Sequence, residues 1–303
     1  MACYTERERE HNFSLNTPVC ILSYNRPDAP IFKSRLFDEL FKDEIFVFIR
    51  NTEQAFEQYK DVGKHATLVP LPDWVMDVGQ TRQAINDWAY NNCYEYIFVI
   101  DDRITKINFL VSSTSRTGKQ SLVASKESSF RTSLLIWEQI LVEHPFTVSC
   151  PAHAGFSYYP ENINVEFIPN NGNVAACIAI NIDDIFDYDI KYRSMKIVGH
   201  DDADFTYSVL KAGLPICKIT DLEYDEVSSG KITSGGTRDN QTVDRYTICQ
   251  QRNKLFWENS LGLQWGEKSN EAYLRKSGDG IYPYFNWKYW KQYYKEHGVK
   301  GVS

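Results

Sequence analysis

The feature that most constrains the fold is an alternation of apolar strands and amphipathic helices through the first hundred residues. Apolar runs of strand length occupy residues 18–23, 44–49, 66–69 and 96–100, and helical spacing fills residues 33–41, 52–59 and 79–90 between them. Strand–helix–strand repeats of this kind are typical of a mostly parallel sheet covered by helices. Right-handed crossovers then predict a Rossmann-like α/β unit.

The fourth strand of this series is followed by three charged residues. Residues 96–104 read YIFVIDDRI, and the apolar part is continuous, which is typical of a strand covered on both faces. Asp101 and Asp102 therefore emerge at the carboxyl edge of the sheet, where open α/β sheets bind ligands. The alternative is a solvated turn in which an aspartate serves as a cap.

The second half of the chain is less regular. The stretch 112–131 is rich in Ser, Thr, Lys and Arg and predicts a loop, and a second loop is expected over the Gly/Ser-rich stretch 226–239. Helices are expected over residues 132–143 and 202–211, and strands over residues 146–150, 174–182 and 215–220. From residue 243 the chain is aromatic and predicted helical. We expect a domain over residues 1–240 with a helical extension, residues 241–303, packed on it.

Composition bears on the cellular location of the protein and on the kinds of binding site that it can have. The N-terminal sequence MACYTEREREHNF is charged and no apolar run of about 18 residues occurs, so we expect a cytoplasmic protein that does not contact a membrane. The seven cysteines are scattered singly, which argues against a zinc site or a disulfide framework. A net charge of −7 means that any binding to a polyanion must come from a local basic patch.

Four short motifs follow one another along the chain, and their order is informative: SYNRP at 23–27, a helix carrying Gly79 and Arg82, the strand tip 101–103, and GHDDADF at 199–205. In this order the sequence resembles the GT-A nucleotide-sugar glycosyltransferases. It is most similar to the TET-associated group, phage enzymes that glycosylate hydroxymethylated pyrimidines in DNA. The resemblance covers about residues 18–225.

The resemblance implies a GT-A fold with a mostly parallel sheet flanked by helices, and a hexosyl- or pentosyltransferase. The donor would be a nucleoside-diphosphate sugar, most simply a UDP-sugar. The acceptor would be 5-hydroxymethylpyrimidine in DNA, modified in the host cytoplasm if a phage encodes the chain. Two alternatives stay open: a GT-A transferase acting on a glycan or lipid-linked acceptor, and a GT-A-like binding module without turnover.

The leaving group explains why carboxylates belong at the strand tip. A departing nucleoside diphosphate carries negative charge, which Mn²⁺ or Mg²⁺ stabilises with one or two protein carboxylates. We expect Asp102 to be the metal ligand, although Arg103 stands where the related motif has a third aspartate. Either Asp102 binds the cation with help from Asp225 or Glu226, or Arg103 itself supplies positive charge.

The resemblance also assigns residues to the substrates. The residues expected to bind the nucleotide sugar are Ser23, Asn25, Arg26, Arg82, Asp101, Arg103, Lys231 and Arg238, the last two on a loop that would close over the diphosphate. An acceptor hydroxyl needs a carboxylate to remove its proton, and Asp201 and Asp202 are the catalytic candidates. Either could instead cap the helix that follows. The residues expected to contact the acceptor are His200, Arg116, Lys119 and Lys126, against the alternative of a solvated loop.

Overall fold

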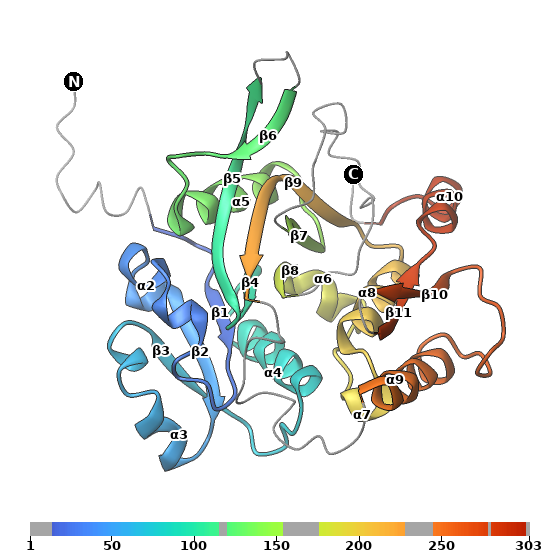
Figure 1. Cartoon of the computed structure of the whole chain (residues 1–303), viewed down its shortest axis with the longest axis horizontal. Helices are drawn as coiled ribbons and strands as arrows, with labels where there is room; N and C mark the ends of the chain where they lie inside the picture. Colours follow the sequence, from blue (N-terminus) through green and yellow to red (C-terminus); the bar gives the residue numbers. More distant parts are fainter. Residues whose placement is uncertain (1–13, 115–119, 154–175, 228–244, 278–279, 301–303) are drawn as a thin grey trace.

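The computed structural model describes residues 14–114, 120–153, 176–227, 245–277 and 280–300. Within them, nine strands form one sheet in the order β3-β2-β1-β4-β8-β7-β9-β5-β6 (Figure 1). These strands are β1 (Val19–Leu22), β2 (Ile45–Arg50), β3 (Thr67–Leu71), β4 (Tyr96–Asp101), β5 (Ile104–Thr114), β6 (Gln120–Ala124), β7 (Val148–His153), β8 (Cys177–Asn181) and β9 (Ile216–Glu226). Two further strands, β10 (Ala272–Ser277) and β11 (Gly280–Phe285), form a separate hairpin.

Helices cover both faces of the sheet. They are α2 (Leu36–Glu39), α3 (Glu53–Gln58), α4 (Val78–Asn91), α5 (Phe130–Glu143), α6 (Ile182–Asp187), α7 (Met195–Val198), α8 (Asp201–Ala212), α9 (Arg245–Asn259) and α10 (Trp287–His297). Side chains begin several of them: the Thr52 hydroxyl, the Asp77 carboxylate and the Ser129 hydroxyl accept backbone N–H bonds at the starts of α3, α4 and α5.

The predicted α/β class is confirmed. Strands β3, β2, β1 and β4 pair in parallel through their crossover helices, as the alternating pattern indicated. Beyond β4 the pairing is mixed: β8 is antiparallel to both of its neighbours, β7 and β9 are parallel, and β5 returns antiparallel to β9. The parallel strands therefore end at one edge, where the tip of β4 lies.

The apolar strands are buried from both sides. In β4, Ile97 and Val99 face the core under α4 and α8, whereas Phe98 and Ile100 face the core under α2 and α5. On that second face Trp137 of α5 packs 4.8 Å from the Phe98 ring. Since neither face of the strand meets water, the uninterrupted apolar run in the sequence has a direct structural cause.

The C-terminal segment joins the same core. Phe256, Phe285 and Trp290 are buried in the cluster that also contains the sheet residues of the α4 face. This packing accounts for part of the high aromatic content, whereas Trp265 and Tyr273 of the same segment are exposed. The hairpin β10–β11 between α9 and α10 was not predicted, because the helical expectation extended over the whole segment. The division at residue 240 stays a prediction.

The loop predicted over residues 112–131 is confirmed for residues 125–129 and wrong for the other described parts. β5 continues to Thr114 and pairs with β6, with Val111 opposite Val123, so the chain forms a hairpin that projects from the body (Figure 1). Both valines are exposed. A hairpin with no buried face needs no apolar alternation, which is why the sequence pattern did not reveal it.

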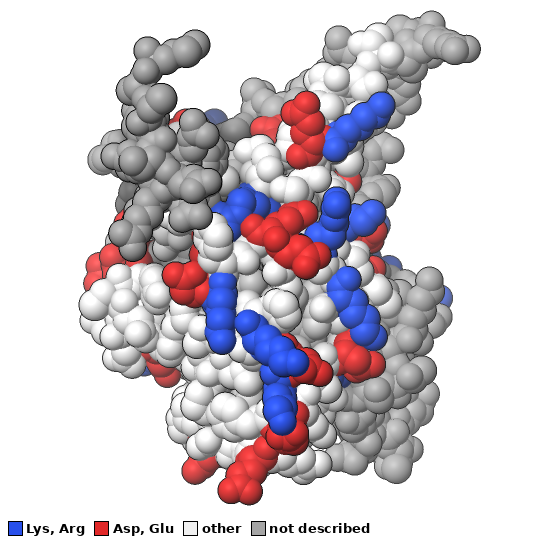
Figure 2. Space-filling view, turned by 90° about the vertical axis from the view of Figure 1, so that its left-hand side faces the viewer, with Lys and Arg blue, Asp and Glu red and all other residues white. Residues whose placement is uncertain are grey.

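The surface of the described residues mixes charges. On the face toward the left of Figure 1, basic and acidic side chains are interspersed and no continuous basic area is visible among the described residues (Figure 2). Among the residues that the structure describes, every helix is too short or too polar to cross a bilayer. The cytoplasmic location stays a prediction.

Candidate active site

Three charged residues occupy the connection between β4 and β5. β4 ends at Asp101, a turn contains Asp102 and Arg103, and β5 begins at Ile104. The Asp101 and Arg103 side chains are 16% and 23% exposed, whereas that of Asp102 is 1% exposed. The two aspartates therefore have different surroundings although they are adjacent in the sequence.

Asp102 points into the protein. Its Oδ2 accepts a hydrogen bond from Ser23 Oγ at 2.9 Å and lies 3.2 Å from Arg26 Nε. Tyr59 completes this group, since its hydroxyl lies 2.7 Å from Ser23 Oγ and accepts the Arg26 backbone N–H. Burial raises the pKa of the Asp102 carboxyl to about 6, although Arg26 favours its charged form. Asp102 thus connects the SYNRP motif, residues 23–27, to the tip of β4.

Arg103 lies against carboxylates from two strands. Its guanidinium donates to Asp101 Oδ2 at 3.1 Å and lies 3.2 Å from Glu226 Oε2, at the end of β9. The antiparallel pairing of β5 with β9 brings Glu226 opposite Ile104 and so next to this turn. The position that departs from the related motif therefore presents a guanidinium held by two carboxylates.

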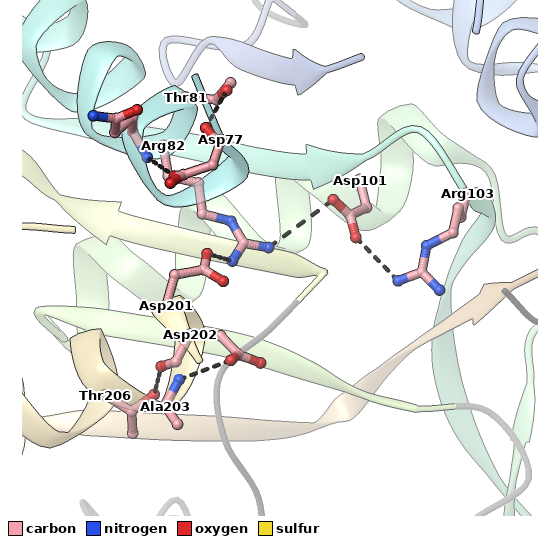
Figure 3. A network of polar contacts seen from close by, with 10 residues as sticks. Asp77, Thr81, Arg82, Asp101, Arg103, Asp201, Asp202, Ala203 and Thr206 are labelled. Atoms are coloured by element: carbon pink, nitrogen blue, oxygen red, sulfur yellow. Dashed lines mark hydrogen bonds and ion pairs between the residues drawn. The ribbon is translucent and has the colours of Figure 1, made fainter. Parts of the chain in front are cut away.

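Arg82 links the strand tip to the start of α8. Its guanidinium donates to Asp201 Oδ2 at 2.5 Å and lies 4.0 Å from Asp101 Oδ1, so it stands between the two carboxylates (Figure 3). The ring of Tyr192 lies beneath it, 5.6 Å from the guanidinium carbon. Burial is the largest single effect and lowers the pKa of Arg82, but the charges of Asp201, Asp101 and their neighbours together outweigh it, so that pKa is raised.

The two acidic residues at the start of α8 differ in access. Asp201 is buried, and burial raises the pKa of its carboxyl to about 6 against the opposing effect of Arg82. Asp202 is half-buried; its Oδ1 accepts the Ala203 N–H at 2.8 Å, and its backbone carbonyl accepts from Thr206 Oγ1 (Figure 3). Of the two residues, Asp202 is the more exposed.

His200 precedes this pair. Its Nε2 lies 3.0 Å from Asn253 Oδ1, on α9. Burial lowers the pKa of the imidazole, and the Asp202 charge opposes that shift only in part, so the ring is neutral at pH 7. His200 does not cap α8 with its side chain.

The structure thus brings most of the predicted residues to one edge. Asn25 lies in the turn after β1 with a positive φ of 51°, and Lys126 lies exposed in the turn between β6 and α5. Four predicted residues lie outside the described residues: Arg116, Lys119, Lys231 and Arg238. Their roles stay predictions. Sequence reasoning missed Tyr59 and Tyr192, because nothing local marks an aromatic residue that supports a charged one from another element.

The described residues do not fit a preformed site for a divalent cation. Both oxygens of Asp101 face arginines, and Asp102, the predicted ligand, is buried against Ser23 and Arg26. Among the residues that the structure describes, no group of three or more His, Cys, Asp and Glu side chains is placed to hold a metal ion. The predicted metal ligand stays a prediction, and we assign no step to a metal.

Comparison with known proteins gives a family match over most of the chain. Residues 17–236 match the family model described as TET-Associated Glycosyltransferase. No significant match was found among curated protein sequences.

Solved structures give weaker likenesses. A structure of S. aureus TarS residues 1–349 is 14% identical, with 70% of this chain and 60% of that chain covered and a TM-score of 0.45. Glucosyl-3-phosphoglycerate synthase from Mycobacterium tuberculosis, solved with Mn²⁺, UDP-glucose and phosphoglyceric acid, is 10% identical over 93% of this chain and 92% of that chain, with a TM-score of 0.47. The chain thus spans 60% of the length of the TarS fragment. At these identities, what those proteins bind says nothing about the substrates of this chain.

Proposed function

The chain belongs to the TET-associated glycosyltransferase family, and from this premise we propose that it moves a sugar from a nucleoside-diphosphate sugar to the hydroxyl of 5-hydroxymethylpyrimidine in DNA. The observation that carries the proposal is the position of Arg82. It joins Asp101, at the tip of β4, to Asp201, at the start of α8. One continuous charged site therefore spans the sheet edge, with a donor side and an acceptor side.

On the donor side, arginines receive the diphosphate. As the bond between the anomeric carbon and the β-phosphate oxygen breaks, negative charge accumulates on the leaving nucleoside diphosphate. Arg82 and Arg103 both contact the Asp101 carboxylate, one at each oxygen, and Arg103 also contacts Glu226. Such preorganised guanidinium groups stabilise phosphate charge without moving during the reaction.

On the acceptor side, Asp202 removes the proton. The acceptor oxygen bonds to the anomeric carbon while its proton passes to the Asp202 carboxylate, and the nucleoside diphosphate leaves with the electron pair of the broken bond. Asp201 keeps Arg82 in position instead, because its Oδ2 is already engaged at 2.5 Å. We propose that Lys126, with Arg116 and Lys119, contacts the DNA backbone from the β5–β6 side.

Mass spectrometry of nucleosides tests the proposal. The protein is incubated with a panel of labelled nucleotide sugars, UDP-sugars first, and with DNA that contains 5-hydroxymethylcytosine; the DNA is then digested. We expect a nucleoside heavier by one sugar residue with hydroxymethylated DNA and none with unmodified DNA. Transfer to a glycan or lipid-linked acceptor, with none to DNA, would replace the proposed acceptor.

A further inference from the structure

The hairpin β10–β11 lies outside the residues that match the family model. Its two strands are antiparallel, and side chains alternate between its faces. Ala272 and Phe285 lie on one face and are buried in the core. The register places Tyr273 opposite Tyr284 and Arg275 opposite Tyr282, so these four residues share the other face.

The four outward residues form a stacked aromatic and basic surface, which we call the hairpin platform (Tyr273, Arg275, Tyr282 and Tyr284). The rings of Tyr273 and Tyr284 stack with centroids 6.2 Å apart and planes 24° apart. The Arg275 guanidinium carbon lies 5.4 Å from the centre of the Tyr284 ring. Tyr273 is 46% exposed although its ring is large and apolar.

The hairpin platform is fixed to the acceptor side of the active site. The Tyr282 ring meets the His200 ring edge-on, with centroids 6.1 Å apart. Asn253 makes a second link, because its side-chain NH₂ donates to the Ile281 carbonyl at 2.8 Å. The Asn253 Oδ1 then faces His200 and accepts its Nε2–H, which fixes the ring. His200 directly precedes Asp201, so these contacts connect strand β11 to the start of α8.

We propose that the hairpin platform binds the acceptor polynucleotide, stacking one or two bases on its tyrosines and holding a phosphate with Arg275. This inference rests on the proposed function and names the surface that delivers the acceptor to Asp202. Aromatic rings beside a guanidinium are what a single-stranded or extruded run of nucleotides recognises. A base inside a duplex has to leave the stack to enter a pocket, and an aromatic surface next to that pocket offsets the lost stacking.

The charge distribution supports a local contact of this kind. The chain has a net charge of −7, so its overall charge does not attract DNA. The face in Figure 2 mixes acidic and basic side chains and offers no continuous basic area among the described residues. Stacking on the three tyrosines of the hairpin platform adds affinity that does not depend on the net charge of the chain.

Fluorescence anisotropy with a labelled, unmodified single-stranded oligothymidine tests the proposal without requiring sugar transfer. The test variant is Tyr273→Ala/Arg275→Ala, and Tyr273→Phe serves as the conservative variant. Two matched controls exist in the chain. Tyr90→Ala removes another exposed tyrosine, stacked on Phe186 at 4.0 Å, and Lys276→Ala removes a cation of β10 that lies on the other face.

We expect the test variant to raise the Kd for the oligonucleotide about tenfold or more, with Tyr273→Phe and both controls within about twofold of the unmutated protein. Arg275→Ala alone should reduce the slope of log Kd against log salt concentration by about one, because one phosphate contact is lost. Titration with a nucleoside diphosphate should give the same affinity in all variants, which shows that the site itself is folded.

An unchanged Kd in the test variant, or an equal loss in Tyr90→Ala, would overturn the proposal. Loss of binding to a soluble oligosaccharide, with oligonucleotide binding retained, would overturn it too and assign the surface to a glycan. Sugar transfer to hydroxymethylated DNA by the unmutated protein is measured separately, so the failure of the hairpin platform and the failure of the proposed function give different results.

Discussion

At the scale of single residues, neighbours in the sequence have different tasks. Asp101 is partly exposed and faces two arginines, whereas Asp102 is buried against Ser23 and Arg26. The sequence predicted that charge gathers at this strand tip, and the structure confirms it. Which aspartate turns inward could not be predicted, because it depends on Tyr59 and Arg26, which other elements bring to the site.

Replacement of the two aspartates should separate these tasks. Asp101→Ala should lower kcat/KM about 100-fold with little change in Tm, because Arg82 and Arg103 lose a common partner that orients them. Asp102→Ala should instead lower the free energy of unfolding by roughly 3 kcal/mol, because it leaves Arg26 without its ion-pair partner in a largely buried position. Thermal unfolding and steady-state kinetics of both variants check this. Equal losses of stability would contradict the assignment.

The pH dependence should report Asp201. Burial raises the pKa of its carboxyl to about 6, so it is ionised above that pH and becomes protonated as the pH falls through 6. Protonation weakens the ion pair that holds Arg82, and we therefore expect kcat/KM to decline below pH 6. In Asp201→Asn the activity should be lower at pH 7.5, and its decline between pH 7 and 5 should disappear.

Asp102→Asn is the control for that profile, because the pKa of Asp102 is also raised to about 6. We expect this variant to keep the decline, since Asp102 lies away from Arg82 and supports the first motif. If the decline vanishes in Asp102→Asn and persists in Asp201→Asn, the titrating carboxyl is that of Asp102, which contradicts the assignment to Asp201.

At the scale of elements, the site depends on how closely α4 approaches the start of α8. A Cβ on Gly79 would lie 2.2 Å from the Arg193 carbonyl oxygen and 3.1 Å from Asp201 Cβ. Only glycine permits this contact, and the contact lets Arg82, one turn further along α4, reach Asp201.

Gly79→Ala should therefore displace α4 and separate Arg82 from Asp201. We expect a loss of stability of about 2 kcal/mol and a fall in kcat/KM of about tenfold or more. Gly63→Ala is the matched control, because its Cβ would meet only the flexible end of the Leu68 side chain, at 3.1 Å. Unchanged activity in Gly79→Ala would show that the approach of α4 is not required.

The elements that sequence reasoning predicted well are those with a buried face. β4 and α4 were found because their apolar residues follow the periods that packing imposes. The β5–β6 and β10–β11 hairpins were missed for the opposite reasons. The first has exposed residues on both faces, and the second lies in an aromatic segment whose rings suit a helix as well as a strand.

At the scale of the whole molecule, parallel pairing brings distant motifs together. The first motif, the strand tip and the start of α8 are separated by up to about 180 residues, yet they meet because β1 and β4 are neighbours and α4 and α8 pack on the same face. Their order in the sequence predicted that they belong to one site. The ion pairs within that site required the structure.

The balance of charge bears on metal dependence. The cations that the described site presents are guanidinium groups, so we expect transfer to continue in EDTA at no less than about half the rate seen with Mn²⁺ or Mg²⁺. Arg103→Ala should lower kcat about 100-fold, and added Mn²⁺ should not restore it. Complete loss of activity in EDTA, with recovery on addition of Mn²⁺, would show that a cation supplies this charge instead.

The central claim is transfer of a sugar to a hydroxymethylated base through the site that Arg82 joins, and one measurement tests it most directly. DNA containing 5-hydroxymethylcytosine is incubated with labelled nucleotide sugars and either the unmutated protein or Asp202→Asn, and the digested nucleosides are analysed by mass spectrometry. We predict a glycosylated hydroxymethylcytosine nucleoside with the unmutated protein and about 100-fold less or none with Asp202→Asn. The absence of any glycosylated nucleoside with the whole donor panel, or equal yields from the two proteins, would contradict the account.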